Sequence, residues 1–209
     1  MHEKVLPKHS LDLLSEMEGH SSPLLANWIL AGGTGLAFLL GHRISEDLDF
    51  FRTDNLDLRD LHPVLDSHGP YETLQESEHT LTVLLQGTKL SFFRIRDPFI
   101  FKPQPYRFFS IASVEEIALM KLAAVSSRGS RKDFADLYVI LQQGGSLEAY
   151  FEMLPRKYGA SRVNTYHILK SLTYFADAEK EPMPRMLVPF DWDACKAFFV
   201  RQARAILLP

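Results

Sequence analysis

The pattern of hydrophobic and polar residues changes near residue 110. Before this point, short apolar runs alternate with turn-forming residues, which is typical of β-strands. The runs that predict strands are residues 27–31, 48–52, 71–75, 80–86 and 89–95, with helices expected at 10–17, just before residue 41, and at 56–67. After this point, apolar residues recur every three or four positions, as on helices that bury one face. Helices are predicted over residues 113–124, 130–143, 146–158, 161–176 and 191–206.

The two patterns together predict the fold class. A strand-rich first part followed by a helical second part indicates an α+β fold. We expect a small mixed β-sheet core with flanking helices over residues 1–110, followed by a C-terminal helical bundle over residues 111–209. In the helical part, the spacing of Tyr166, Tyr174 and Phe175 suits packing between helices.

Composition narrows the class of protein. The chain has 209 residues, of which 46% are hydrophobic and 23% charged, so it can bury a core and is not of a disordered type. The single Cys195 excludes an intramolecular disulfide, and no cluster of cysteine and histidine suggests a zinc site. The sequence shows neither a signal peptide nor a membrane-spanning apolar stretch. We therefore expect a cytoplasmic protein that does not associate with membranes.

Charge is distributed unevenly along the chain. The formal net charge is −3, but residues 1–150 carry −6 and residues 151–209 carry +3. A basic C-terminal part can meet a polyanion such as RNA. The alternative is a solvated helical surface without a specific ligand.

A glycine pair lies where the first predicted strand gives way to a helix. Gly32 and Gly33 follow the apolar strand at residues 27–31 and precede Thr34. Glycine allows a ligand to approach the backbone closely, and the first amides of a helix have no partner within the helix. The positive end of the helix dipole favours a phosphate there. The alternative for such a glycine pair is a tight turn.

Two acidic residues lie on the next predicted strand. Asp47 and Asp49 are separated by one residue, so their side chains point to the same face of a strand while Leu48 and Phe50 face the core. Neighbouring carboxylates repel each other unless a cation lies between them. Mg²⁺ prefers oxygen ligands and bridges to phosphate oxygens. The alternative is two exposed acids on an edge strand.

The spacing of these two features resembles a known signature. Gly32 and Gly33 are followed, after thirteen residues, by the alternating acids Asp47 and Asp49 with hydrophobic neighbours, as in the polymerase-beta-like nucleotidyltransferase superfamily. Four segments resemble more narrowly the AbiEii-type nucleotidyltransferase family, whose members are often toxins of type IV toxin–antitoxin systems. These segments are residues 31–36, 41–51, 120–124 and 128–138.

The resemblance implies an enzyme that transfers a nucleoside monophosphate from an NTP to an acceptor hydroxyl. The acceptor would be the 3′ end of a tRNA or other RNA, or a protein, and a cognate antitoxin protein would be a partner. The resemblance implies that Asp47 and Asp49 hold Mg²⁺ or Mn²⁺ and that Lys121 contacts the triphosphate. Asp136 aligns with a second essential acid. The helical domain would then complete the nucleotide site.

Further residues are candidates for binding the nucleotide. Gly32, Gly33 and Thr34 are expected to hold the triphosphate together with Lys121, and Arg43 and Ser45 are placed to bind phosphate or the target strand. Asp133 and Asp136 are three residues apart and so share one helix face. Without the resemblance, these two acids would be read as salt-bridge partners of nearby basic residues, among them Arg128.

One position departs from the superfamily pattern. Many members carry a third carboxylate on a later strand, where it acts as general base for the incoming hydroxyl. In this chain Ser91 is expected at that position. Either another acid such as Asp136 supplies the base, or two metal-binding acids suffice, or the protein binds nucleotide and transfers poorly. The sequence thus also allows a catalytically weak nucleotide-binding or antitoxin-binding module.

Overall fold

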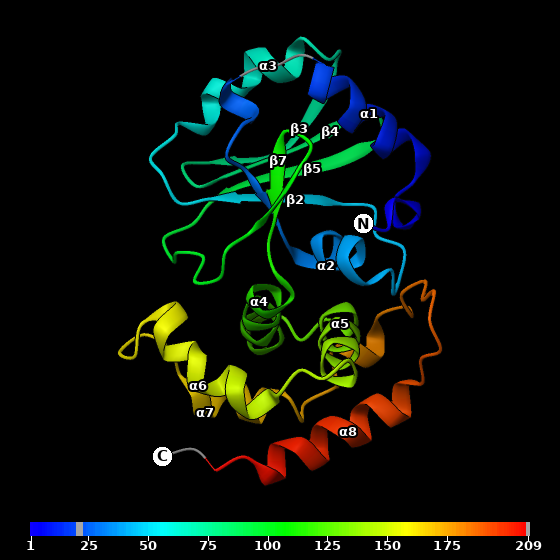
Figure 1. Ribbon diagram of the computed structural model, residues 1–209, viewed down its shortest axis with the longest axis vertical. Helices are drawn as coiled ribbons and strands as arrows, with labels where there is room; N and C mark the ends of the chain where they lie inside the picture. The colour runs from blue at the N-terminus through cyan, green and yellow to red at the C-terminus, as the bar shows by residue number, and fades with distance from the viewer. Residues whose placement is uncertain (20–22, 208–209) are drawn as a thin grey trace. The chain divides into compact units, whose positions relative to one another are not determined.

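The structure is a computed structural model that describes residues 1–19 and 23–207. The chain forms two compact units, Met1–Ser113 and Val114–Pro209 (Figure 1). The first unit contains the β-sheet and the second consists of helices and their connections. The expected order of a mixed sheet followed by a helical bundle is therefore confirmed.

The first unit is built on a seven-stranded sheet with the order β3-β4-β5-β2-β1-β7-β6. The strands are β1 (Ile29–Leu30), β2 (Leu48–Arg52), β3 (Tyr71–Ser77), β4 (Thr80–Leu85), β5 (Thr88–Arg94), β6 (Gln104–Tyr106) and β7 (Phe109–Ile111). The sheet is mixed, because β2 pairs in parallel with β5 and β1 with β7, while the other neighbours are antiparallel. The five predicted strands are present, although β1 is shorter than expected because Asn27 adopts a positive φ of 66°.

The hairpin of β6 and β7 was not predicted. The prolines at positions 98, 103 and 105 indicate a connection rather than a strand pair. Pro105 nevertheless lies in β6, which is the edge strand of the sheet. An edge strand tolerates proline, because the missing N–H leaves no hydrogen bond of the sheet unmade.

Helices cover both faces of this sheet. They are α1 (Lys8–Gly19), α2 (Gly32–Leu40) and α3 (His62–Asp66), with short 3-10 turns at η1 (Glu3–Val5), η2 (Pro23–Leu25) and η3 (Leu58–Leu61). Helices α1 and α3 lie on one side of the sheet and α2 lies on the other (Figure 1). Leu13 and Leu14 of α1 and Leu65 of α3 are fully buried in one cluster with Leu90 and Phe92 of β5. The predicted helix at 56–67 is divided into η3 and α3, with Pro63 in the first turn of α3, where proline is accommodated.

The second unit is a helical bundle. Its helices are α4 (Val114–Ser127), α5 (Arg131–Gln142), α6 (Leu147–Tyr158), α7 (Thr165–Ser171) and α8 (Trp192–Ala205), with a 3-10 turn at η4 (Ala178–Lys180). Helix α4 packs against α5, α6 and α7, and α5 also packs against α8 (Figure 1). Phe134 of α5 lies at the centre of an aromatic cluster, with its ring 5.1 Å from that of Phe175 and 5.6 Å from that of Phe199. Over residues 1–19 and 23–207, no helix has the length and apolar character needed to cross a membrane.

Candidate functional site

The strand–helix turn brings Gly32 against Asp49. Leu30 of β1 pairs with Phe50 of β2, and the Ala31 amide donates a hydrogen bond to the Asp49 carbonyl oxygen over 3.0 Å. Gly32 has a φ of +64°, which an L side chain rarely adopts, and a Cβ at this position would lie 3.1 Å from Asp49 Oδ2. The turn therefore requires glycine for its backbone conformation and for the close approach of the carboxylate.

The start of α2 presents backbone amides. The Ala31 N-cap supplies no side-chain hydrogen bond. The first hydrogen bond along the helix runs from the Gly35 amide to the Ala31 carbonyl, over 3.1 Å. The amides of Gly33 and Thr34 precede it and have no carbonyl acceptor within the helix. Such amides, together with the helix dipole, can bind an anion such as phosphate.

Thr34 and Ser45 connect the loop before β2 to α2. The Thr34 hydroxyl lies 2.7 Å from the Ser45 hydroxyl and also contacts the Asp47 carbonyl oxygen. Ser45 is held from the other side, because its amide donates to the Val5 carbonyl over 3.0 Å. Arg43 is buried, and its guanidinium donates to the Ile44 carbonyl over 3.0 Å. The side chains of all three predicted ligands thus contact the protein itself, and Thr34 contacts the backbone of Asp47.

Asp47 is partly accessible to solvent. Its side chain is 46% exposed, and its Oδ2 lies 3.8 Å from Nζ of Lys89, which is 45% exposed. An ion pair this open contributes about 0–1 kcal/mol. A cation of higher charge can therefore displace Lys89 at little cost. Nothing in the sequence alone singled out Lys89, because its proximity depends on how β2 and β5 pair.

Ser91 lies beside Asp49 in the sheet. The parallel register of β2 and β5 pairs Asp49 with Ser91, and the antiparallel register of β5 and β4 pairs Ser91 with Thr82. Paired residues project to the same face of a sheet, so one carboxylate and two hydroxyls share this row. The Thr82 and Ser91 hydroxyls lie 3.3 Å apart. Ser91 thus lies beside Asp49, as expected, and this row of the sheet offers two neutral hydroxyls where many superfamily members carry a third carboxylate.

The donor set fits a hard cation that a phosphate ligand helps to bind. In the part of the chain that the structure describes, no three side chains of His, Cys, Asp or Glu gather as a complete metal cage. Asp49 lies on β2 and Asp47 directly before this strand; Asp49 approaches Gly32, and Thr34 contacts the Asp47 carbonyl. Mg²⁺ commonly takes one or two carboxylates, with waters and substrate phosphates completing its coordination. Two carboxylates next to the start of a helix agree with this mode of Mg²⁺ coordination.

The second unit holds a buried charge cluster between α4 and α5. Lys121 Nζ lies 2.8 Å from Asp133 Oδ1 and 2.6 Å from Asp136 Oδ2. Arg128 Nε lies 2.6 Å from the other oxygen of Asp133. The side chains of Lys121, Asp133 and Asp136 are 5%, 0% and 0% exposed. The three residues predicted from this part of the chain therefore form one cluster, and Arg128 joins it.

The cluster is charged despite its burial. Burial by itself raises the pKa of Asp133, but the positive charge of Lys121 and the hydrogen bonds and charge of Arg128 outweigh it and hold this pKa below its usual value. Asp133 therefore remains a carboxylate at neutral pH. Lys121 lies between the two acids, where α4 packs on α5.

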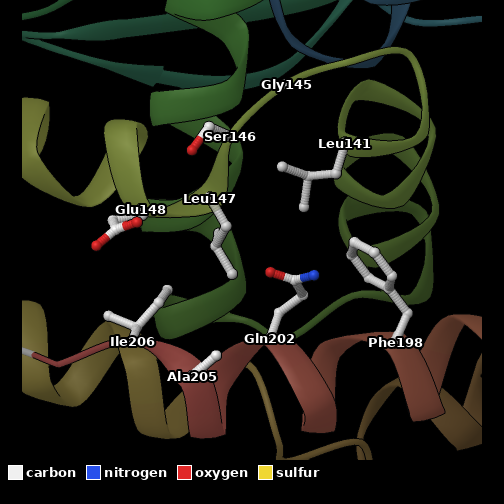
Figure 2. A pocket seen from close by; sticks show the side chains of 9 residues that line it. All are labelled: Leu141, Gly145, Ser146, Leu147, Glu148, Phe198, Gln202, Ala205 and Ile206. Atoms are coloured by element: carbon white, nitrogen blue, oxygen red, sulfur yellow. The ribbon is translucent and has the colours of Figure 1, made fainter.

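A separate pocket of about 320 Å³ lies within the helical unit. Leu141, Leu147 and Phe198 converge on it, and Gln202 lies at its floor (Figure 2). The one charged residue of its lining is Glu148, whose carboxylate would repel phosphate. No predicted site residue lines this pocket, and its chemistry does not suit a nucleotide triphosphate.

Comparison with known proteins identifies sequence relatives. Residues 17–206 match the family model described as nucleotidyl transferase AbiEii toxin, type IV TA system. An uncharacterized protein of Aquifex aeolicus, aq_aa25, is 34% identical over 186 residues, which cover 87% of this chain and 88% of that protein.

Several solved structures share the fold. MenT4, a nucleotidyltransferase toxin from Mycobacterium tuberculosis, superimposes with a TM-score of 0.55 at 16% identity, over 98% of this chain and 88% of that one. JHP933 from Helicobacter pylori gives 0.51 at 16% identity, over 97% and 89%. The antibiotic-resistance factor ANT(2'')-Ia gives 0.56 at 13% identity, over 73% and 92%. At these identities the likeness concerns the fold.

Proposed function

The chain belongs to the AbiEii nucleotidyltransferase toxin family, and from this premise we propose that it transfers a nucleoside monophosphate from an NTP to an acceptor hydroxyl. The observation that carries the proposal is the contact between Asp49 and Gly32 at the start of α2. The start of a helix attracts anions, and a carboxylate beside it repels a bound phosphate unless a cation lies between the two. Their contact in this turn suits a substrate that brings phosphate and metal together.

The triphosphate is proposed to bind at the start of α2. The amides of Gly33 and Thr34 donate to phosphate oxygens, and Gly32 leaves room for them because it has no side chain. Asp47 and Asp49 would hold Mg²⁺ or Mn²⁺, which when bound neutralises charge on the phosphate oxygens. Lys89 would then leave Asp47 and remain close by as a monovalent cation.

Transfer requires an attack on the α-phosphorus. The acceptor oxygen forms a bond to this phosphorus, the bond to the leaving pyrophosphate breaks, and the acceptor proton is released. Ser91 is a poor base at neutral pH, and Asp136 is buried against Lys121, 2.6 Å away. We therefore propose that the proton passes to water or to a phosphate oxygen of the substrate, and that Ser91 helps to orient the acceptor.

The helical domain, residues 111–209, is proposed to complete the nucleotide site through Lys121. Lys121 has two acidic partners, and Asp133 retains Arg128 if Lys121 turns toward a phosphate. Asp133 and Asp136 would thus act as positioning residues that keep Lys121 charged and in place. The competing role for the cluster is purely structural, joining α4 to α5.

The proposed acceptor is an RNA 3′ end, and the proposed location is the cytoplasm, where NTP and RNA are both present. Residues 151–209 carry a net charge of +3, which suits a polyanionic acceptor. A cognate antitoxin protein is the proposed physiological partner, as the family name implies.

The direct test is transfer of label. The purified chain is incubated with each α-labelled NTP in turn, with Mg²⁺ and total RNA or cell extract. We expect labelled RNA with the wild type and none with Asp49→Ala. Glu72→Ala is the matched control, because it removes an exposed acid from β3 of the same unit and should leave transfer unchanged.

The second candidate is a nucleotide-binding module without turnover, which the replacement of the third acid by Ser91 favours. It predicts tight NTP binding with no labelled product on any acceptor. A third candidate is a protein that acts only by binding a partner. It predicts that the double variant Asp47→Ala/Asp49→Ala keeps its effect on the growth of expressing cells.

A further inference from the structure

Two tyrosines of the helical unit are exposed to solvent. Tyr166 is 72% exposed and Tyr174 is 58% exposed, whereas most other described aromatic side chains are partly or fully buried. The expectation that both pack between helices is therefore wrong, while Phe175 does pack, with its ring 5.1 Å from Phe134. Exposed aromatic rings offer flat surfaces on which a ligand can stack.

The two tyrosines lie on one stripe with Lys170. Helix α7 covers Thr165–Ser171, and the chain continues in helical turns to Tyr174, whose amide donates to the Ser171 carbonyl over 3.1 Å. Residues four apart on a helix lie on the same face, so Tyr166 and Lys170 succeed one another on α7, and Tyr174 follows three residues after the end of the helix. Ile168 and Leu172, on the other face, are 4% and 0% exposed. The packed face is thus turned toward the unit and the tyrosine stripe toward solvent.

Basic residues predominate before and along this stripe, and the acids Asp177 and Glu179 follow Tyr174 in the chain. Residues 153–176 contain four Lys or Arg residues and one His, and no Asp or Glu. Of the four, Lys157 is buried against Glu116, which leaves Arg156, Arg162 and Lys170 exposed. The two tyrosine rings are the main apolar surface here, because the neighbouring exposed side chains are basic or carry hydroxyls. This is little apolar area for binding a protein partner. Nucleic acid, in contrast, needs both aromatic rings and cations.

We infer that the α7 stripe, defined as Tyr166, Lys170 and Tyr174, binds a single-stranded segment of the RNA acceptor. Bases stack on the two tyrosine rings, and Lys170 between them contacts a phosphate. Tyr166 and Tyr174 are eight residues apart in the chain, with Lys170 midway between them. This inference rests on the proposed function for the identity of the ligand, and on the geometry of α7 for the surface.

The test measures RNA binding without any NTP, so that it does not depend on transfer. A fluorescent single-stranded RNA of mixed sequence, about twelve nucleotides long, is titrated with the full chain and followed by fluorescence anisotropy. We expect Tyr166→Ala/Tyr174→Ala to raise Kd by at least about tenfold, because each stacked base contributes to binding. Tyr166→Phe/Tyr174→Phe keeps both rings and should bind almost as the wild type does.

Two further variants complete the design. Lys170→Gln should lower the salt dependence of binding by about one phosphate contact while leaving the stacking in place. Leu74→Ala, which truncates a 47% exposed side chain of the first unit, is the matched control and should leave Kd unchanged. Each variant is checked for an unaltered thermal unfolding midpoint, so that a binding change is not attributed to loss of fold.

Several outcomes overturn the inference. These are an unchanged Kd in the double alanine variant, no RNA binding by the wild type, or equally tight and equally tyrosine-dependent binding of a duplex, in which bases cannot stack on side chains.

Failure of the proposed function has a different signature, namely no labelled product despite RNA binding that depends on the tyrosines. If both hold, the double alanine variant raises KM for RNA with little change in kcat at saturating RNA, whereas Asp49→Ala removes transfer and keeps the Kd for RNA.

Discussion

At the scale of single residues, the strand–helix turn depends on the absence of a side chain at Gly32. A side chain there would be strained by the positive φ and would press on Asp49 Oδ2 at 3.1 Å. The spacing of the glycines and the acids was enough to predict this turn, because both features are local in the chain. The proximity of Lys89 and Thr82 to this site could not be predicted, because it depends on the register of the strands, which one sequence does not reveal.

Replacing Gly32 by alanine should damage both stability and transfer. We expect Gly32→Ala to lower the free energy of unfolding by about 1–3 kcal/mol, since a left-handed backbone is unfavourable for alanine. Transfer should fall by about a hundredfold or more, because the displaced Asp49 no longer meets the substrate correctly. Denaturant unfolding and the label assay measure the two effects. Gly19→Ala is the control, as a Cβ there meets nothing within 4 Å, and an equal loss in that variant would contradict the account.

An acid at position 91 should create a stronger metal site at a cost to the metal-free protein. In Ser91→Asp the new carboxylate lies in register with Asp49, so the two repel in the absence of a cation. We expect a lower thermal unfolding midpoint than the wild type in EDTA, and a larger rise on addition of Mg²⁺. Ser91→Asn has nearly the same shape without the charge and should show neither effect. A response to Mg²⁺ no larger than that of the wild type would show that Asp49 and position 91 do not share a cation.

At the scale of elements, the packing of α4 on α5 depends on the buried charges. The apolar spacing after Ser130 was sufficient to predict α5, since periodicity is a property of neighbouring residues, although the Ser130 hydroxyl bonds Glu181 and not the helix. The sequence left open whether Asp133 pairs with Arg128 or serves a ligand, because that depends on the distance between two helices. Helix α7 is shorter than predicted for a local reason: Asn164 accepts a hydrogen bond from the His167 amide over 2.9 Å and so starts the helix late.

Removing one carboxylate from this cluster should destabilise the protein strongly. We expect Asp133→Asn to lower the free energy of unfolding by about 3 kcal/mol, because it leaves Arg128 and part of the charge of Lys121 without their partner. Denaturant unfolding at neutral pH measures the loss. Lys132→Gln, an exposed neighbour on the same helix, is the control and should change the stability by less than about 0.5 kcal/mol.

The same variant should change the response to acid. The folded-state pKa of Asp133 lies below the 3.8 of an unperturbed aspartate, so the unfolded chain takes up the proton first as the pH falls. Its stabilising effect is complete above about pH 5 and is lost as the pH falls below 3.8 toward the folded-state value. The stability difference between wild type and Asp133→Asn should therefore shrink on acidification. A difference that stays constant down to pH 3 would mean that Asp133 is not a depressed, ion-paired carboxylate.

At the scale of the whole molecule, the proposed function requires both units to take part in binding one nucleotide. The glycine turn and the acid pair lie in Met1–Ser113, and Lys121 lies in Val114–Pro209. A ligand that contacts both units stabilises both, whereas a ligand of the first unit alone stabilises that unit. The chain offers a reporter for each, because one of its two tryptophans, Trp28, lies in the first unit and the other, Trp192, in the second.

Single-tryptophan variants should resolve this. In Trp192→Phe the fluorescence reports unfolding around Trp28, and in Trp28→Phe it reports unfolding around Trp192. We expect NTP with Mg²⁺, at about a hundred times its Kd, to raise both midpoints by several degrees, because binding at that concentration stabilises the folded state by about 2.7 kcal/mol. Adding Lys121→Met to the Trp28→Phe variant should reduce the shift seen at Trp192, while Lys132→Gln should not. If NTP moves the Trp28 transition and leaves that of Trp192 in place, the helical unit does not complete the nucleotide site, and the Lys121 cluster serves to hold α4 on α5.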